Sequence, residues 1–207
     1  MRLLFATGNP GKLRELRRLV EGLPVEVISP ADLPGGIPEV EEDGATFAAN
    51  AEKKAVSAAR ASGLHAVADD SGLCVDAIYG LPGVNSARWT EDEAPGLSGV
   101  ARDEANNRRL LRALEGVPDE VRGARYRAVL VLASPGGEVL ARVEGTCRGR
   151  IATAPRGEGG FGYDPLFLPD ARPGRTMAEL PAGEKDALSH RGEAFRALRP
   201  EIERLAR

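Results

Sequence analysis

Residues 2–20, RLLFATGNPGKLRELRRLV, indicate the fold class of this chain. The run 2–6 is apolar apart from its arginine and is typical of a short buried strand. Residues 7–11, TGNPG, are turn formers, and apolar residues then recur at helical spacing from Leu13 to Val20. A strand, a glycine-containing loop and a helix in this order form the opening unit of an α/β fold.

Strands and helices first alternate along the chain, and strands then pair locally. We expect strands over residues 25–28, 64–68 and 73–78, and helices over residues 46–61 and 97–114. Residues 145–173 are expected to be loop-rich with short extended pieces, and a closing helix should begin at about Asp186 and bend at Pro200. Residues 125–133 and 138–143 flank SPGG, which is a clear β-hairpin signal. The combination predicts an α/β fold with a mixed sheet.

Charge and cysteine content narrow the functional classes. The 207 residues carry 28 Lys and Arg against 31 Asp and Glu, a net charge of −3, so we expect no nucleic-acid partner and no membrane partner. No apolar segment is long enough for a signal peptide or a membrane span. The two cysteines, Cys74 and Cys147, lack CxxC spacing and are expected to be reduced, which predicts a cytoplasmic protein.

The loop after the first strand is a candidate phosphate-binding site. Backbone N–H groups at glycines and at a helix N-terminus attract anions, and Lys12 adds a full positive charge. It is not a Walker A loop, because two residues rather than four separate its glycines and Leu13 follows the lysine. A tight turn with an ordinary surface lysine is the alternative. The candidate residues are Thr7, Gly8, Asn9, Pro10, Gly11 and Lys12.

Two acidic segments are candidates for a metal site. Asp69 and Asp70 follow an apolar run, so we expect this pair at the end of a strand. If the strand continues, the two side chains must point to opposite faces. The acidic run EVEED, residues 39–43, is the second segment. Such carboxylates suit Mg²⁺, which takes one or two of them plus substrate phosphates, although a solvated acidic loop is the alternative for residues 39–43.

Residues 157–165, GEGGFGYDP, form a glycine-rich arm with two aromatic side chains and a carboxylate. The arm contains G-x-G-x-x-G, but the dinucleotide fingerprint must open a helix, and an extended segment follows here. Phe161 or Tyr163 could stack on a base, and Asp164 could hydrogen-bond it. A surface loop whose phenylalanine fills the core is the alternative.

Lys185 and His190 lie five residues apart near the start of the closing helix. Lys185 could reach a phosphate, and His190 with Arg191 offers donors for a carbonyl oxygen. Taken singly, a surface lysine and a capping histidine are the ordinary interpretations.

Together these segments closely resemble the inosine triphosphate pyrophosphatases, also called non-standard purine NTP pyrophosphatases or XTP/dITP diphosphatases. The resemblance covers essentially the whole chain. Its marks are Thr7-Gly8-Asn9 with Lys12, Glu41 ahead of Thr46-Phe47 with Asn50-Ala51 and Lys54-Ala55, Ala68-Asp69-Asp70-Ser71-Gly72, Gly80-Leu81-Pro82-Gly83 with Ser86-Ala87-Arg88, Gly160-Phe161-Gly162-Tyr163-Asp164-Pro165, and Lys185 with Ser189-His190-Arg191-Gly192.

The resemblance implies a single domain, residues 1–207, made of two merged lobes. An elongated mixed sheet flanked by helices would run through it, with the active-site cleft between the lobes. The implied activity is Mg²⁺-dependent hydrolysis of ITP, dITP or XTP to the nucleoside monophosphate and pyrophosphate, by a homodimer that removes deaminated purine nucleotides.

The resemblance also implies roles for individual residues. Thr7 to Lys12, with Lys54, Ser71 and Lys185, would hold the triphosphate. Glu41, Asp69 and Asp70 would hold Mg²⁺, and Asp70 would be the general base. The base pocket would comprise Phe161, Gly162, Tyr163, Asp164, His190 and Arg191.

Base selectivity then has a physical explanation. A purine 6-oxo group would accept from Arg191 or His190, whereas the 6-amino group of adenine would leave those donors unpaired. Two alternatives remain open at this point. One is a pyrophosphatase for modified pyrimidine nucleotides or dTTP, and the other is a non-catalytic nucleotide-sensing module.

Overall fold

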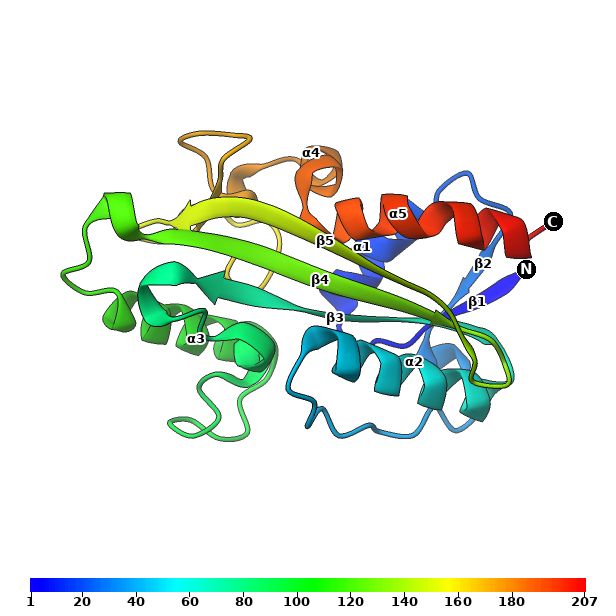
Figure 1. Cartoon of the computed structure of the whole chain (residues 1–207). Helices are drawn as coiled ribbons and strands as arrows, with labels where there is room; N and C mark the ends of the chain where they lie inside the picture. Colours follow the sequence, from blue (N-terminus) through cyan, green and yellow to red (C-terminus); the bar gives the residue numbers. More distant parts are fainter. The chain divides into compact units, whose positions relative to one another are not determined.

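The opening unit folds as the sequence predicts. β1 (Arg2–Phe5) leads through residues 6–9 into α1 (Pro10–Leu19) (Figure 1). Asn9 caps this helix, because its side-chain oxygen accepts from the backbone N–H groups of Gly11 and Lys12 at 2.8 and 3.2 Å. Pro10 stands at the first helical position, where a missing N–H carries no penalty. The loop sequence therefore fixes the start of the helix that carries Lys12.

The computed structural model describes all residues from 1 to 207. After α1 come β2 (Glu26–Ile28), α2 (Phe47–Ser62), β3 (His65–Val75), α3 (Gly99–Ala113), β4 (Gly123–Ala133), β5 (Val139–Ile151), β6 (Phe167–Pro169), α4 (Ala182–Leu188) and α5 (His190–Leu205). One sheet contains the strands in the order β2-β1-β3-β4-β5-β6. β1 is parallel to β2 and β3, and β5 is antiparallel to β6. The predicted α/β fold with a mixed sheet flanked by helices is confirmed.

The chain divides into two compact units, each with its own hydrophobic core. Unit 1 comprises residues 1–70, 128–145 and 191–207, and unit 2 comprises residues 71–127 and 146–190. The boundaries fall inside β3, β4 and β5, so these strands contribute residues to both units.

Helices cover both faces of the sheet in unit 1 (Figure 1), with α1 and α5 on one face and α2 on the other. Leucine and phenylalanine side chains of α1 and α5 join those of β1 and β4 in the core, among them Leu3, Phe5, Leu16, Leu130, Phe195 and Leu198. The buried side of α2 consists of Ala51, Ala55, Ala58 and Ala59. Because these side chains are small, the backbone of α2 can approach the sheet closely. The helix ends at Gly63, whose φ of 68° is accessible to glycine at low cost.

The core of unit 2 gathers side chains from β3, β4, β5, β6 and α3. Its members include Leu73, Val75, Leu110, Tyr126, Ile151 and Phe167. Arg122 is buried here, and its guanidinium donates to the backbone carbonyls of Leu114, Ile151 and Ala152 at 2.8 to 3.0 Å. This cation therefore has a structural role.

Three expected boundaries are wrong. β3 runs without a break from His65 to Val75, so Asp69 and Asp70 lie in the middle of a strand and not at its end. β5 extends to Ile151, beyond the expected end of this strand at residue 143. The closing helix is two helices, α4 and α5, which meet at Ser189, and Pro200 lies inside the second.

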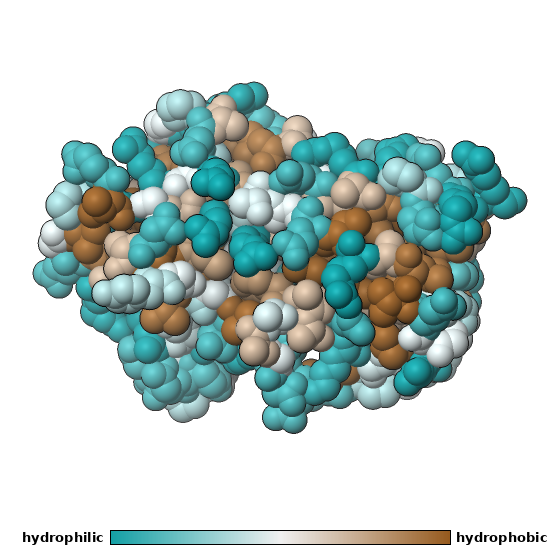
Figure 2. Space-filling model, in the orientation of Figure 1, coloured by the Kyte–Doolittle hydropathy of each residue, from teal (hydrophilic) through white to brown (hydrophobic).

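The surface carries few large apolar side chains. Tyr79, Leu81, Val100 and Val121 are the exposed ones. Figure 2 shows a face on which hydrophilic residues dominate and hydrophobic residues form small patches. None of the helices is both long enough and apolar enough to cross a membrane.

Candidate active site

Two lysines of unit 1 converge on one backbone oxygen. Lys12, from the first turn of α1, donates from Nζ to the carbonyl oxygen of Asp69 at 3.4 Å. Lys54, from α2, donates to the same oxygen at 3.1 Å. Burial lowers the pKa of Lys12, and the neighbouring Lys54 lowers it further, although Asp69 acts in the opposite direction. Two ammonium groups this close together form a local positive charge that suits a phosphate.

Asp69 is fully buried and surrounded by cations. Its Oδ2 accepts from Arg191 Nε at 3.0 Å and lies 3.1 Å from Lys12 Nζ. Burial would raise the pKa of Asp69, but Arg191 and Lys12 outweigh burial and hold it well below its usual range. Arg191 also pairs with the buried carboxylate of Glu15 on α1. Glu15, Arg191, Asp69 and Lys12 thus form a continuous chain of buried charges.

Asp70, the next residue of β3, has different partners. Its Oδ1 accepts from Lys54 Nζ at 2.8 Å, and its Oδ2 accepts from Asn50 Nδ2 at 3.4 Å. Burial raises the pKa of Asp70, and Lys54 offsets this only partly. Asp69 and Asp70, although adjacent, thus have pKa values that are shifted in opposite directions.

Helical spacing on α2 explains the partners of Asp70. Asn50 and Lys54 are four residues apart and lie on the same face of the helix. The side-chain oxygen of Asn50 also accepts from the backbone N–H of Gly44 at 2.8 Å. Asn50 therefore ties the loop before α2 to the strand that carries Asp70.

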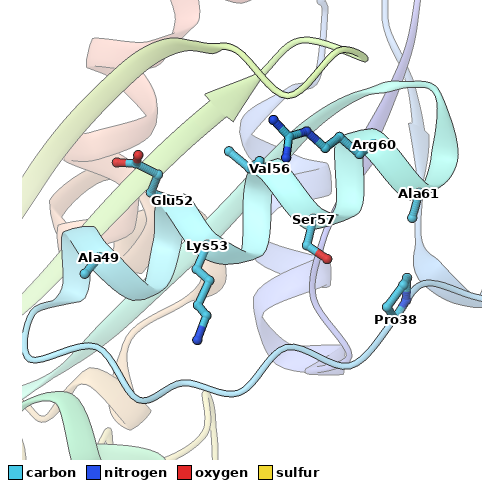
Figure 3. Close-up of a pocket in the computed structure, with 8 residues that line it drawn as sticks. All are labelled: Pro38, Ala49, Glu52, Lys53, Val56, Ser57, Arg60 and Ala61. Carbon is cyan, nitrogen blue, oxygen red and sulfur yellow. The ribbon is translucent and has the colours of Figure 1, made fainter.

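The opposite face of α2 lines a cavity of about 860 Å³ (Figure 3). Its lining residues are Pro38, Ala49, Glu52, Lys53, Val56, Ser57, Arg60 and Ala61. Lys53 is exposed there and pairs with Asp43 at 2.7 Å. This cavity contains none of the acids or lysines that surround Asp69 and Asp70, so we do not assign the chemistry to it.

Glu42, rather than Glu41, lies beside Asp70. Lys54 Nζ donates to Glu42 Oε1 at 2.9 Å and to Asp70 at 2.8 Å, so the two carboxylates flank one cation. These carboxylates raise the pKa of Lys54 against the effect of burial. Glu41 is exposed and its side chain forms no hydrogen bond or ion pair. No group of three or more His, Cys, Asp or Glu side chains is arranged to hold a metal ion.

A second group of predicted residues gathers in unit 2 around Asp164. Lys185 Nζ lies 2.5 Å from Asp164 Oδ2 and 4.9 Å from the centre of the Phe161 ring. Tyr126 donates to Asp164 Oδ1 at 3.3 Å, and the ring of His190 stacks on Tyr126 at 4.7 Å. Lys185 is buried and belongs to this aromatic group, not to the lysine pair of unit 1.

The two aromatic side chains of the glycine arm have different environments. Tyr163 is buried, and its hydroxyl donates to the carbonyl oxygen of Ser86 at 2.8 Å. Phe161 is half-buried, and its backbone N–H donates to Asp164 Oδ2 at 2.9 Å. Of the two rings, only that of Phe161 keeps exposed surface for stacking on a base.

The remaining predicted phosphate-binding residues come from the loop before α1 and from β3. Thr7 accepts from the backbone N–H of Asn9 at 3.1 Å, which stabilises the turn before α1. Gly8 and Pro10 are exposed, and a Cβ at Gly8 would meet no atom within 4 Å. Ser71 is the half-buried first residue of the β3 segment in unit 2.

His190 and Arg191, predicted as one pair of donors, have different partners. The His190 ring stacks on Tyr126, and the Arg191 guanidinium is buried against Asp69 and Glu15. Their contact with a purine 6-oxo group stays a prediction.

Glu15 and Tyr126, which belong to these clusters, were not singled out from the sequence. Asn50 appeared there only as a mark of the resemblance, and Glu42 only as a member of the acidic run 39–43. Glu15 stands three residues after Lys12, and Asn50 stands four residues before Lys54. Helical spacing could therefore have indicated both residues. Glu42 differs from Glu41 only in its position relative to the start of α2. For Tyr126, an aromatic residue in a strand, no local signal existed.

Comparison with known proteins identifies the family of this chain. The chain matches the model of the Ham1 family over residues 3–201 and belongs to that family. The predicted resemblance is therefore confirmed. A dITP/XTP pyrophosphatase of Anaeromyxobacter dehalogenans (strain 2CP-C) is 60% identical, with 100% of this chain and 99% of that protein covered. One of Geobacter sulfurreducens is 51% identical, with 97% and 96% covered.

Solved structures show the same fold. A HAM1 protein from Coxiella burnetii aligns with a TM-score of 0.82 at 35% identity, with 99% of each chain covered. A nucleoside-triphosphatase, or dITP/XTP pyrophosphatase, from Mycobacterium abscessus aligns with a TM-score of 0.71 at 47% identity, with 97% of this chain and 100% of that chain covered.

Proposed function

We propose that this protein hydrolyses the deaminated purine nucleotides ITP, dITP and XTP to the nucleoside monophosphate and pyrophosphate. The observation that carries the proposal is the convergence of Lys12 and Lys54 on the Asp69 carbonyl, directly beside the carboxylate of Asp70. Cleavage of a phosphoanhydride needs cations that bind the triphosphate and a carboxylate that accepts a proton from the attacking water. The names of the relatives support the same reaction.

The lysines and the loop of residues 7–12 would bind the triphosphate. Lys12 is at the N-terminus of α1, so the helix dipole adds to its charge. Lys54 supplies a second cation from α2. Positive charge fixed before the reaction stabilises the negative charge that develops on the phosphoryl oxygens.

The metal-dependent chemistry requires a cation site, and we assign it to Asp70 and Glu42 with Mg²⁺ as the ion. These carboxylates already flank one cation, the Lys54 ammonium, at 2.8 and 2.9 Å, so their positions fit a shared positive ion. Two carboxylates together with substrate phosphates are a typical Mg²⁺ ligand set. When bound, Mg²⁺ would neutralise phosphate charge during the transfer. Glu41 and Asp69 are weaker candidates, because Glu41 is exposed and Asp69 is held by Arg191 and Lys12.

Asp70 would act as general base. Asn50 and Lys54 hold its two oxygens in place, so the carboxylate is positioned to accept a proton from the attacking water. Arg191 and Glu15 would act indirectly, since they keep Asp69 ionised and hold it in one orientation.

The unit 2 group would recognise the base. Phe161 would stack on the purine, and the donors of Lys185 and His190 would favour a 6-oxo acceptor over a 6-amino donor. This assignment moves Lys185 from the phosphate-binding set to the base-binding set.

We further propose a cytoplasmic homodimer. Cys74 and Cys147 are buried and form no disulfide, which is compatible with a reducing compartment. Light scattering coupled to size-exclusion chromatography tests the dimer, and a mass of 21.9 kDa would contradict it.

Product analysis tests the reaction. With ITP and Mg²⁺ in ¹⁸O-water, we expect IMP and pyrophosphate in equal amounts, and the product that carries ¹⁸O identifies the phosphorus attacked. Formation of IDP and inorganic phosphate, or no hydrolysis at all, would contradict the proposed function.

A further inference from the structure

Two side chains of α3 hold the same residue of the glycine arm in unit 2. Asp103 Oδ2 accepts from the backbone N–H of Gly162 at 2.7 Å. Asn107 Nδ2 donates to the backbone carbonyl oxygen of Gly162 at 2.9 Å. The two residues are four apart and therefore lie on one face of the helix. One helical turn thus binds both backbone groups of a single loop residue.

These contacts fix the conformation of Gly162. Its N–H and its C=O belong to the peptide planes on either side of the residue, so the two bonds hold both planes. The φ of Gly162 is 62°, in the left-handed region that favours glycine. A Cβ there would meet no atom within 4 Å, so glycine is needed for backbone conformation and not for space.

The same contacts limit the freedom of Phe161. The peptide plane after Phe161 is held by Asp103, and its own N–H is held by Asp164 at 2.9 Å. Its ring lies against the Lys185 ammonium at 4.9 Å. Both backbone dihedrals of Phe161 are therefore restrained, and the ring keeps one orientation.

The hydrogen bonding of Asn107 indicates positioning rather than stabilisation. Its Oδ1 is buried and has no hydrogen-bond partner. A flipped amide would place that oxygen against the Gly162 carbonyl, so the orientation with Nδ2 toward Gly162 is required. Since a buried acceptor without a partner is unfavourable, the net contribution of Asn107 to stability is small.

We propose that Asp103 and Asn107 are positioning residues for base recognition, which hold Gly162 and thereby present the Phe161 ring to the purine. The inference rests on the proposed function, in which Phe161 stacks on the base. Neither residue touches the nucleotide in this account. They act by preorganising the stacking surface before the ligand arrives.

Equilibrium binding tests the inference independently of turnover. The Kd for IMP and the Kd for pyrophosphate are measured by titration calorimetry for wild type, Asn107→Leu, Asp103→Asn and Asp103→Ala. Asn107→Leu should weaken IMP binding about 5-fold, which corresponds to one lost hydrogen bond, and leave pyrophosphate binding within about 2-fold. Asp103→Ala should behave similarly, whereas Asp103→Asn keeps an acceptor for the Gly162 N–H and should restore most of the affinity. Glu104→Gln, on the exposed side of α3, is the matched control.

A double-mutant cycle separates this role from a general structural one. In a Phe161→Ala background, Asn107→Leu should no longer affect the Kd for IMP, because its effect passes through the ring. An unchanged Kd for IMP in the single variant, an equal loss in both backgrounds, or a parallel loss of pyrophosphate affinity with a lowered Tm would each overturn the proposal. Failure of the proposed function would appear separately, as absence of pyrophosphate release from ITP by the wild type.

Discussion

Lys12 and Lys54 both donate from Nζ to one oxygen, the backbone carbonyl of Asp69, at 3.4 and 3.1 Å. They come from different helices, α1 and α2. Like charges at this separation repel, and in the folded protein the carboxylates of Asp69 and Asp70 offset the repulsion. A bound triphosphate would offset it further, which is why we assign the phosphate site to this pair.

The neighbouring lysines of α2 provide a matched test of the phosphate site. Lys54→Met should raise the KM for ITP by about 10-fold or more, since it removes a buried charge-assisted contact to phosphate. Lys53→Met should leave both kinetic constants unchanged, because Lys53 is exposed and pairs only with Asp43. Steady-state kinetics on both variants decide this, and equal effects of the two substitutions would argue against the assignment.

Asp70→Asn should abolish turnover and retain nucleotide binding. The amide has nearly the same shape as the carboxylate but cannot accept a proton from water, so we expect kcat to fall by about 100-fold or more. Binding of ITP, measured by calorimetry in the absence of turnover, should stay within about 10-fold of wild type. A variant with wild-type kcat would exclude Asp70 as general base.

Glu42 and Glu41 can be distinguished by their metal dependence. Glu42→Gln should increase the Mg²⁺ concentration required for half-maximal activity, by about 10-fold, because it removes one of two carboxylates that flank the cation position. Glu41→Gln should have little effect, since its carboxylate is exposed. The reverse outcome would restore the assignment based on sequence resemblance.

Arg191→Ala should reduce activity without relaxing selectivity. Removal of Arg191 leaves Asp69 and Glu15 buried without their shared cation, so we expect a loss of stability of about 3 kcal/mol. Turnover of ITP and ATP should fall in parallel. In contrast, His190→Ala should lower kcat/KM for ITP more than for ATP. If Arg191→Ala instead changes the ratio of ITP to ATP turnover, the arginine contacts the base after all.

Acid should destabilise the metal-free protein through Asp69. Because its folded-state pKa lies well below the ordinary value of about 4, its contribution is fully present above that pH and is lost as the pH falls. Asp70, whose pKa is raised, acts in the opposite direction. Urea unfolding of wild type and Asp69→Asn between pH 3 and 7 measures the contribution of the Asp69 charge. The difference between the two proteins in free energy of unfolding should shrink below about pH 4. A constant difference would show that the Asp69 charge is not linked to stability.

The sequence predicted the parts of the fold that local signals control. The strand, loop and helix of residues 2–19, the α2 helix with its glycine end, and the β4–β5 hairpin all follow from spacing and turn residues. The continuity of β3 through Asp69-Asp70-Ser71-Gly72 was not predictable, because polar residues ordinarily end a strand. Here Lys12, Lys54 and Arg191, all distant in sequence, neutralise these acids and allow the strand to continue.

The site residues also show a difference between what local sequence predicts and what depends on distant residues. Their identities were visible in short motifs, but their partners were not, since an ion pair such as Arg191 with Asp69 joins residues far apart in the chain. Sequence adjacency also suggested that His190 and Arg191 act together. They are consecutive residues of α5, but their side chains have different partners, Tyr126 for His190 and Asp69 for Arg191. The choice between Glu41 and Glu42 depended on how the loop enters α2, which spacing alone did not specify.

The most direct test of the central claim is kcat/KM for ITP, XTP, dITP, GTP and ATP with Mg²⁺ under one set of conditions. The account predicts that ITP, XTP and dITP are preferred over ATP by about 10- to 100-fold, the discrimination expected when adenine leaves a buried donor unpaired. Equal values for ITP and ATP would contradict it.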